Sequence, residues 1–270
     1  MLGDGGAFTL LARETVVVPE VTTALTMSGD RAERTVAFPA DDKALFTFTG
    51  RRGEAWSIGL VADEADEGDD AADPMLELFP GEGTSKASLL TDDDSGGGLN
   101  ARIVAELTDD GTYTVRVSSL SSKGRARLTV EKMTLRPATV GNLAYGAPTT
   151  VSFDSNSPFV VGDSARRLVP YALYRLPGSP APRTMTGEMI VIQATSDGLD
   201  PYLEVGLDTP LGFATVLSND DTDGLNSRVT LDPAKFAGEG ADWWDKLRVR
   251  VSAPVGSTGE VQVTVERAPD

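Results

Sequence analysis

The sequence predicts an all-β protein made of two tandem antiparallel β-sandwich domains. Three observations support this fold class: short alternating segments rich in Val and Thr, frequent turn residues, and an internal repeat. The 270 residues include 28 glycines and 16 prolines, and no long segment has the 3.6-residue period of an amphipathic helix. Because 40% of the residues are hydrophobic, each half of the chain can fill its own core.

The internal repeat divides the chain into two copies. The acidic, glycine-rich passage DPMLELFPGEGTSKASLLTDDDSGGGLN at residues 73–100 returns as DPYLEVGLDTPLGFATVLSNDDTDGLN at residues 200–226. Alternating segments stand on both sides of each passage, and the copies close on RARLTVEK and EVQVTVER. The copies meet near EKMTLRPATVGN, so we expect one domain at residues 1–135 and a second at residues 139–270.

Each copy is expected to form about seven to nine short strands separated by turns, as in an antiparallel sandwich. In the first copy the main strands are expected, in order, at KALFTFTG, GEAWSIGLVAD, DPMLEL, LNARIVAEL, GTYTVRVSS and RARLTVEK. In the second copy they are expected at YALYRL, GEMIVIQAT, DPYLEV, LNSRVTL, KLRVRVSA and EVQVTVER. A longer loop precedes the V-R-V strand of the second copy.

Alternation within these strands separates a core face from a solvent face. The hydrophobic positions of the two V-R-V strands are expected in two cores: Tyr113, Val115, Val117, Leu247, Val249 and Val251. Pro74 and Pro201 follow an aspartate at equivalent places in the repeat. We expect both prolines at the start of a strand, where the missing N–H donor is tolerated.

Composition excludes several classes of function. The 41 acidic and 24 basic residues give a formal charge of -17, which repels nucleic acid and suits a cation or a basic polymer. The absence of Cys excludes disulfides and thiolate metal sites, and the absence of His removes the usual general base and the common zinc ligand. The sequence therefore predicts a protein that is not an enzyme. No apolar run has the length of a membrane span, and the first residues lack the pattern of a secretory signal.

The repeated order of motifs resembles a known family. Both copies carry D-P-x-L-E-[LV], an Asp/Asn-rich turn, G-L-N-[AS]-R-[IV] and a V-R-V strand, and in this they resemble bacterial pre-peptidase C-terminal domains. The resemblance implies a jelly-roll-like β-sandwich without catalytic activity, found as an accessory module of exported bacterial proteins and related to calcium-dependent collagen-binding modules. It also implies a secreted or cell-surface location.

The acidic phrases are candidate calcium sites. Oxygen donors stand at alternate positions, and glycines allow the tight turn that would let them converge on one ion. The candidate ligands are Asp92, Asp94, Asn219, Asp221 and Asp223. An EF-hand is excluded, since its closing Glu would fall at Ile103 and Thr230. The alternative is that these residues form turns only, with side chains bonded to nearby backbone amides.

Two further pairs of residues are candidates for a role at these sites. Arg102 and Arg228 follow the acidic turns, and we expect a guanidinium there to tie each turn to the next strand. Trp243 and Trp244 lie in the longer loop of the second copy. On an extended segment they would point to opposite sides, so that one ring could be exposed for binding a sugar ring or a proline of a partner. The alternative is that these aromatic side chains pack under the edge of the sandwich and bind nothing.

These observations leave two functions open. The first is a non-catalytic binding or targeting module of an exported bacterial protein, with calcium as a stabilising ion and an extracellular protein or a polysaccharide as partner. The second is a structural spacer subunit of a cell-surface layer or appendage, with contacts along its strand edges. The sequence predicts neither the ligand nor the oligomeric state.

Overall fold

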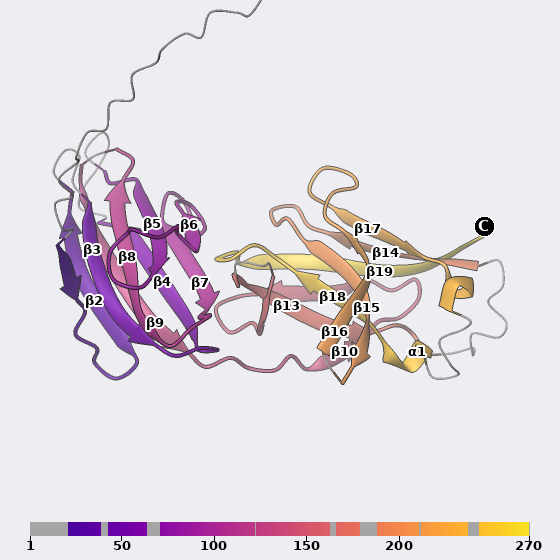
Figure 1. Ribbon diagram of the computed structural model, residues 1–270. Coiled ribbons are helices and arrows are strands. Elements are labelled where there is room, and N and C mark those ends of the chain that lie inside the picture. Colours follow the sequence, from indigo (N-terminus) through magenta and orange to yellow (C-terminus); the bar gives the residue numbers. More distant parts are fainter. Residues whose placement is uncertain are drawn as a thin grey trace, which may run out of the picture.

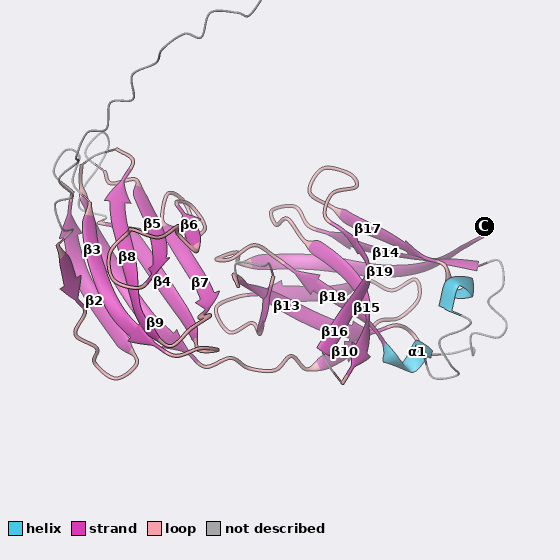
Figure 2. Ribbon diagram, in the orientation of Figure 1, coloured by secondary structure: helices cyan, strands magenta, loops and turns pink. Residues whose placement is uncertain are grey.

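The computed structural model describes residues 21–38, 43–63, 71–121, 123–162, 166–178, 188–210, 212–236 and 243–269. Figures 1 and 2 show two β-sandwiches arranged end to end, in which almost all regular structure is strand. Helix in the described residues is confined to the single turns η3 (Pro233–Phe236) and α1 (Trp243–Lys246). The predicted fold class is confirmed.

The first sandwich contains all strands up to β9. One sheet has the order β1-β3-β8-β5-β6 and the other has the order β2-β9-β4-β7. The strands are β1 (Thr22–Ala24), β2 (Arg31–Ala37), β3 (Ala44–Gly50), β4 (Ala55–Ala62), β5 (Pro74–Pro80), β6 (Leu90–Asp92), β7 (Ala101–Glu106), β8 (Gly111–Ser119) and β9 (Arg125–Met133).

The second sandwich repeats this arrangement with the strands from β10 onward. One sheet has the order β10-β13-β18-β15-β16, with β12 paired to β13, and the other has the order β11-β19-β14-β17. The strands are β10 (Val140–Asn142), β11 (Thr149–Phe153), β12 (Phe159–Val161), β13 (Leu168–Arg175), β14 (Glu188–Thr195), β15 (Tyr202–Thr209), β16 (Gly212–Asn219), β17 (Ser227–Leu231), β18 (Leu247–Ser252) and β19 (Gly259–Pro269).

Each sandwich has a hydrophobic core of its own. The core of the first includes Tyr113, Val115 and Val117, whose side chains are almost completely buried. The core of the second includes Leu247, Val249 and Val251. The alternation of the two V-R-V strands therefore predicted the core faces correctly.

The two prolines of the repeat lie where strands begin. Pro74 is the first residue of β5, and Pro201 comes directly before β15. At these positions neither proline removes a hydrogen bond from the middle of a ladder. This prediction is confirmed.

An ion pair shared by both copies explains two of the repeated charges. The Glu of D-P-x-L-E lies opposite the Arg of V-R-V in the register of the paired strands: Glu77 faces Arg116 on β8, and Glu204 faces Arg250 on β18. Both pairs form salt bridges. Glu204 receives two hydrogen bonds from Arg250, of 2.5 Å and 2.7 Å. The carboxylates are buried, so each depends on its arginine for compensation.

The two sandwiches contact each other along the edge strand β7. Ala105 forms an isolated bridge with Arg167, and the backbone N–H of Glu106 donates to the carbonyl of Arg166 at 3.0 Å. A small apolar cluster crosses the contact, and its buried members are Ala55, Val104, Leu168 and Val255. The second sandwich therefore covers an edge that would otherwise present unpaired backbone groups.

Candidate functional site

The two acidic turns share one hydrogen-bonded frame. In the first, Oδ1 of Asp92 accepts the backbone N–H groups of Ser95 at 3.1 Å and Arg102 at 2.8 Å. In the second, Oδ1 of Asn219 accepts the backbone N–H of Arg228 at 2.9 Å. The same oxygen also accepts the hydroxyl of Thr222 at 2.7 Å. The first residue of each acidic turn therefore acts as a turn cap.

The asparagine that ends each turn holds it against a neighbouring strand. Asn100 accepts the backbone N–H of Ala62 at 2.9 Å, and Asn226 accepts that of Ser196 at 3.0 Å. Two positions earlier, Gly98 and Gly224 have φ angles of 63° and 64°, which a residue with a side chain adopts only with strain. The G-L-N motif is thus a requirement of the turn.

The predicted calcium ligands do not form a metal-binding group among the described residues. Oδ1 of Asp92 and of Asn219 is occupied by turn amides, while Asp94, Asp221 and Asp223 are exposed. Within the described ranges, no group of three or more acidic side chains is arranged to hold a metal ion. Calcium binding therefore stays a prediction.

The prediction that the guanidinium of Arg102 contacts the first acidic turn was wrong. The guanidinium of Arg102 donates to the hydroxyl of Ser57 at 3.4 Å. The pKa of Arg102 is lowered, because the effect of burial outweighs the opposite effect of Glu131. Only the backbone N–H of Arg102 contacts the turn. The guanidinium at Asp92 comes from the other sandwich, where Arg167 pairs with Oδ2 at 3.3 Å. In the second copy Arg228 is exposed and also contacts its turn through the backbone.

Neither candidate tryptophan is exposed for binding, and the structure shows the alternative, in which the aromatic rings pack under the sandwich. Trp243 and Trp244 are 3% and 7% exposed. They begin the helical turn α1, so the opposite orientation of neighbours on an extended segment does not apply. Trp243 stacks on Phe236, with ring centroids 5.0 Å apart, and contacts Trp244 edge-on at 5.3 Å. Both rings belong to the core of the second sandwich.

A cleft beside the second acidic turn is the strongest candidate site. We call it the acidic cleft, and it has a volume of 490 Å³. Its walls come from β12, β13, β15, β18 and adjoining loops, and the lining residues are Val160, Gly162, Val169, Asp200, Tyr202, Glu204, Asp220, Arg250, Ser252, Ala253 and Pro254. The cleft combines an apolar wall with three carboxylates and one guanidinium.

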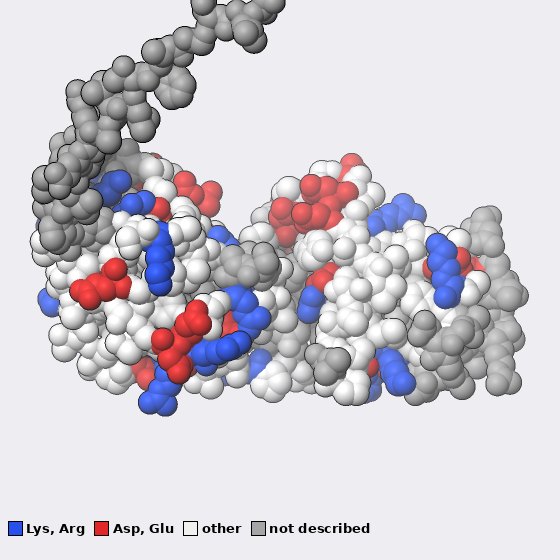
Figure 3. Space-filling model, viewed as in Figure 1, with Lys and Arg blue, Asp and Glu red and all other residues white. Residues whose placement is uncertain are grey.

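The charge of the acidic cleft is unbalanced. Glu204 is neutralised by Arg250, but Oδ1 of Asp200 is buried and has no hydrogen-bond partner. Burial raises the pKa of Asp200, and the neighbouring carboxylates of Asp220 and Asp221 raise it further. Figure 3 shows acidic side chains gathered at the top of the second sandwich, over the β14–β15 and β16–β17 loops. A cation would relieve this repulsion.

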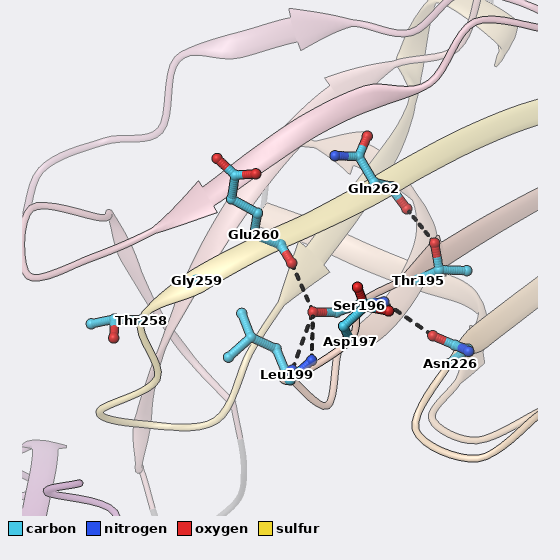
Figure 4. A pocket seen from close by; sticks show the side chains of 10 residues that line it. Thr195, Ser196, Asp197, Leu199, Asn226, Thr258, Gly259, Glu260 and Gln262 are labelled. Carbon is cyan, nitrogen blue, oxygen red and sulfur yellow. Dashed lines mark hydrogen bonds between the residues drawn. The ribbon is translucent and has the colours of Figure 1, made fainter.

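A second, polar pocket of 410 Å³ lies around the turn after β14 (Figure 4). Its polar groups are largely bonded to one another. The hydroxyl of Ser196 donates to the carbonyl of Glu260 at 2.7 Å and accepts the backbone N–H of Leu199 at 3.1 Å. These bonds fix the conformation of the β14–β15 turn that carries Asp200. The residues of this pocket therefore help to position one wall of the acidic cleft.

Sequence reasoning missed Asp200 as a site residue. The signal available was the repeated D-P-x-L-E motif, in which Asp200 corresponds to Asp73. That motif was interpreted as the beginning of a strand, which is correct for the proline but does not reveal the environment of the aspartate. The approach of Asp220 and Asp221 to Asp200 depends on how two loops fold together.

Sequence comparisons do not assign the chain to a family. No protein-family model matches it, and no curated protein matches it. No helix in the described part of the chain has the length and apolar character needed to cross a membrane.

Solved structures with similar folds include three of interest. The pre-peptidase C-terminal domain of a collagenase from Bacillus anthracis aligns over 42% of this chain and 97% of its own, with 14% identity and a TM-score of 0.33. PliG from Aeromonas hydrophila, a periplasmic inhibitor of g-type lysozyme, aligns over 42% and 96%, with 11% identity and a TM-score of 0.33. The tandem CBM22 domains of Xyn10C from Paenibacillus barcinonensis align over 89% and 87%, with 12% identity and a TM-score of 0.27. At such low scores these similarities assign no function to this chain.

Proposed function

We propose that the chain is a non-catalytic binding module of an exported bacterial protein, and that the acidic cleft is its ligand site and takes a cation. The absence of His and Cys from all 270 residues supports a role without catalysis. The secreted or cell-surface location, and an extracellular protein or polysaccharide as the wider partner, are supported by the motif resemblance of both copies. Calcium is the ion for which the cleft offers the most suitable donors.

The observation that carries this proposal is the buried, unpartnered oxygen of Asp200. A carboxylate oxygen buried without a partner destabilises the fold unless it is hydrogen-bonded, protonated or bound to a cation, and the effect is modest here because Asp200 as a whole is only partly buried. Burial and then the carboxylates of Asp220 and Asp221 raise the pKa of Asp200, so protonation and cation binding compete at the same place. The arginine of the cleft is already engaged by Glu204, which leaves the cleft with net negative charge.

The donors suit calcium better than other common metal ions. Calcium takes six to eight oxygen ligands in flexible geometry, whereas zinc prefers His and Cys, which the chain lacks. Asp200 and Asp220 line the cleft, and Asp221 lies close enough to influence Asp200. The described residues hold no group of three carboxylates already arranged around one point, so backbone carbonyls and water would supply most of the shell. The first copy is a poorer site, because both oxygens of Asp92 are already engaged.

The contact between the sandwiches favours a structural spacer as the second candidate function. The bridge at β7 and the apolar cluster would hold the two sandwiches in one orientation. A fixed tandem is suited to spanning a distance at a cell surface. This function does not require the acidic cleft to be occupied.

Thermal unfolding in EDTA and in millimolar calcium tests the proposal. Binding to the folded state alone stabilises it by about 2.7 kcal/mol when free calcium is one hundred times the dissociation constant, which raises the melting temperature by a few degrees. Asp200→Asn should lose this gain. Asp73→Asn, the same change at the equivalent place in the first copy, should keep it.

Magnesium should stabilise less than calcium, because it prefers octahedral geometry and gives up water reluctantly. If calcium leaves the melt of the unaltered protein unchanged, the acidic cleft does not bind it. If Asp200→Asn gains as much stability as the unaltered protein, calcium binds elsewhere and the assignment of the cleft is wrong.

A further inference from the structure

The edge strand β16 differs from its counterpart in the first copy. In the first sandwich the equivalent edge is β6, which has three residues. Pro80 ends β5, and the loop from β5 to β6 contains Glu82 and Lys86; all three residues disfavour the addition of a further strand. This loop is held on the sheet by Thr114, whose hydroxyl accepts the N–H of Gly83 at 2.9 Å and donates to the carbonyl of Gly81 at 2.8 Å.

In the second sandwich the same edge is long and unprotected by charge. Strand β16 has eight residues, GFATVLSN, with neither a charged residue nor a proline. It pairs with β15 on one side, with a β-bulge that leaves Val216 without a cross-strand partner, and no described strand pairs with its other side. Val216 is 43% exposed, and Ala214 and Thr215 are exposed beside it. An edge of this kind can accept another strand through its free backbone groups.

Charge at the ends of β16 indicates what kind of strand would fit. The strand runs into the second acidic turn, where Asp220, Asp221 and Asp223 are all exposed. At its other end Asp208 is near Arg248, at 3.5 Å. A second copy of the chain would bring another formal charge of -17 to this edge. An uncharged segment with basic residues at one end would be complementary to it.

We propose that β16 binds an extended peptide segment of another protein, and that this segment has an uncharged β-forming stretch preceded by Lys or Arg. The peptide adds antiparallel to β16 as an outer strand of the sheet. Because the strands run in opposite directions, the amino end of the peptide lies beside Asn219, next to the acidic turn. The backbone edge of β16 is separate from the lining of the acidic cleft, but the acidic turn that faces the lysines includes Asp220, which also lines that cleft. Binding of the peptide is therefore measured in EDTA, where no calcium occupies the turn.

Two synthetic peptides test both the site and the direction. The first has two lysines followed by alternating threonine and valine, and the second has the two lysines after the same run, both with blocked ends. Fluorescence anisotropy in EDTA should show the first peptide binding about three- to tenfold more tightly, since a few exposed charge pairs supply that difference. The preference should fall with added salt.

Variants with an altered edge provide the control. Val216→Lys places a charge on the open edge and should weaken binding of the first peptide by about tenfold or more. Val61→Lys makes the same change at a valine that is 38% exposed on β4, a strand paired on both sides, and should leave binding unchanged. Thermal unfolding checks that both variants are folded.

Three results would overturn the proposal. The first is that neither peptide binds the unaltered protein, and the second is that Val216→Lys binds as well as Val61→Lys. The third is a dimer in sedimentation experiments that Val216→Lys abolishes, because the occupant of the edge would then be a second copy of the chain. Tighter binding of the second peptide would contradict the antiparallel direction.

Discussion

The first and second acidic turns have the same backbone frame and different surroundings. Both are capped by their first residue, Asp92 or Asn219, and both are closed by an asparagine. The first turn lies against the other sandwich. Arg167 pairs with Asp92, and Gly256 approaches so closely that a Cβ there would be 1.6 Å from the carbonyl oxygen of Ser95.

The second turn has no such cover in the described part of the chain, and it meets the unpartnered Asp200 instead. The two copies share the hydrogen bonds that define the turn, whereas their acidic side chains have different surroundings. In the first copy they contribute to the contact between sandwiches. In the second they form the rim of a cleft.

The largest loss of stability should come from breaking the buried Glu–Arg ion pair that both copies share. Arg116→Ala and Arg250→Ala each leave a buried glutamate without its partner, and each should destabilise its sandwich by about 3 kcal/mol. Urea unfolding followed by fluorescence reports on both halves, because Trp56 lies in the first core and Trp243 in the second, and a Trp56→Phe background leaves the signal of the second half alone. If one of the two variants loses less than about 1 kcal/mol, the ion pair contributes less to the stability of that copy than of the other.

Exchanging Asp and Asn at the two capping positions should change the stability of the protein by different amounts. Asp92→Asn keeps an oxygen for the turn amides but loses the charge that faces Arg167, and it should destabilise the protein by about 1 kcal/mol. Asn219→Asp keeps the cap and adds one carboxylate to an exposed turn, which should cost only a few tenths of a kcal/mol. Urea unfolding measures both, and the reverse order of effects would contradict the distinction.

The smallest effect concerns Asp200 without calcium. Its pKa is raised in the folded state by burial and by Asp220 and Asp221, so the folded protein holds the proton more tightly than the unfolded chain. Stability is therefore lost as pH rises from the unfolded value of about 3.9 through the raised pKa. In EDTA at pH 7, Asp200→Asn should stabilise the protein by a few tenths of a kcal/mol, since the residue is only partly buried.

Comparison of melts at different pH values separates this electrostatic effect from a packing effect. The gain in stability from Asp200→Asn should disappear below about pH 3.5, because the carboxyl of Asp200 in the unaltered protein is then mostly protonated in the folded and in the unfolded state. An advantage that persists at low pH would mean that the aspartate is not destabilised by its charge.

Much of the fold could be predicted from the sequence because the determining signals are local. Period-2 alternation identified the core faces of β8 and β18, and the repeat placed Pro74 and Pro201 at strand starts. The turns were also foreseeable, since Gly98 and Gly224 provide the left-handed backbone that each requires. These features depend on neighbours in the chain or on the paired strand.

The predictions from sequence failed for residues whose surroundings depend on packing between distant parts of the chain. Trp243 and Trp244 belong to a helical turn that packs into the core, which adjacent positions in a sequence do not reveal. Arg102 was expected to pair with the acidic turn, but the arginine that reaches Asp92 comes from the other copy. The site at Asp200 depends on two loops from different parts of the chain.

The central claim is that only the second acidic turn belongs to a cation site, and amide NMR during a calcium titration tests it most directly. The backbone amides of Leu199 and Asp200, of Tyr202 to Glu204 and of Asn219 to Gly224 should shift as calcium is added. Those of Thr91 to Asn100 should stay in place, because Asp92 is already engaged by turn amides and Arg167. Equal shifts in both turns, or shifts confined to the first, would contradict the account.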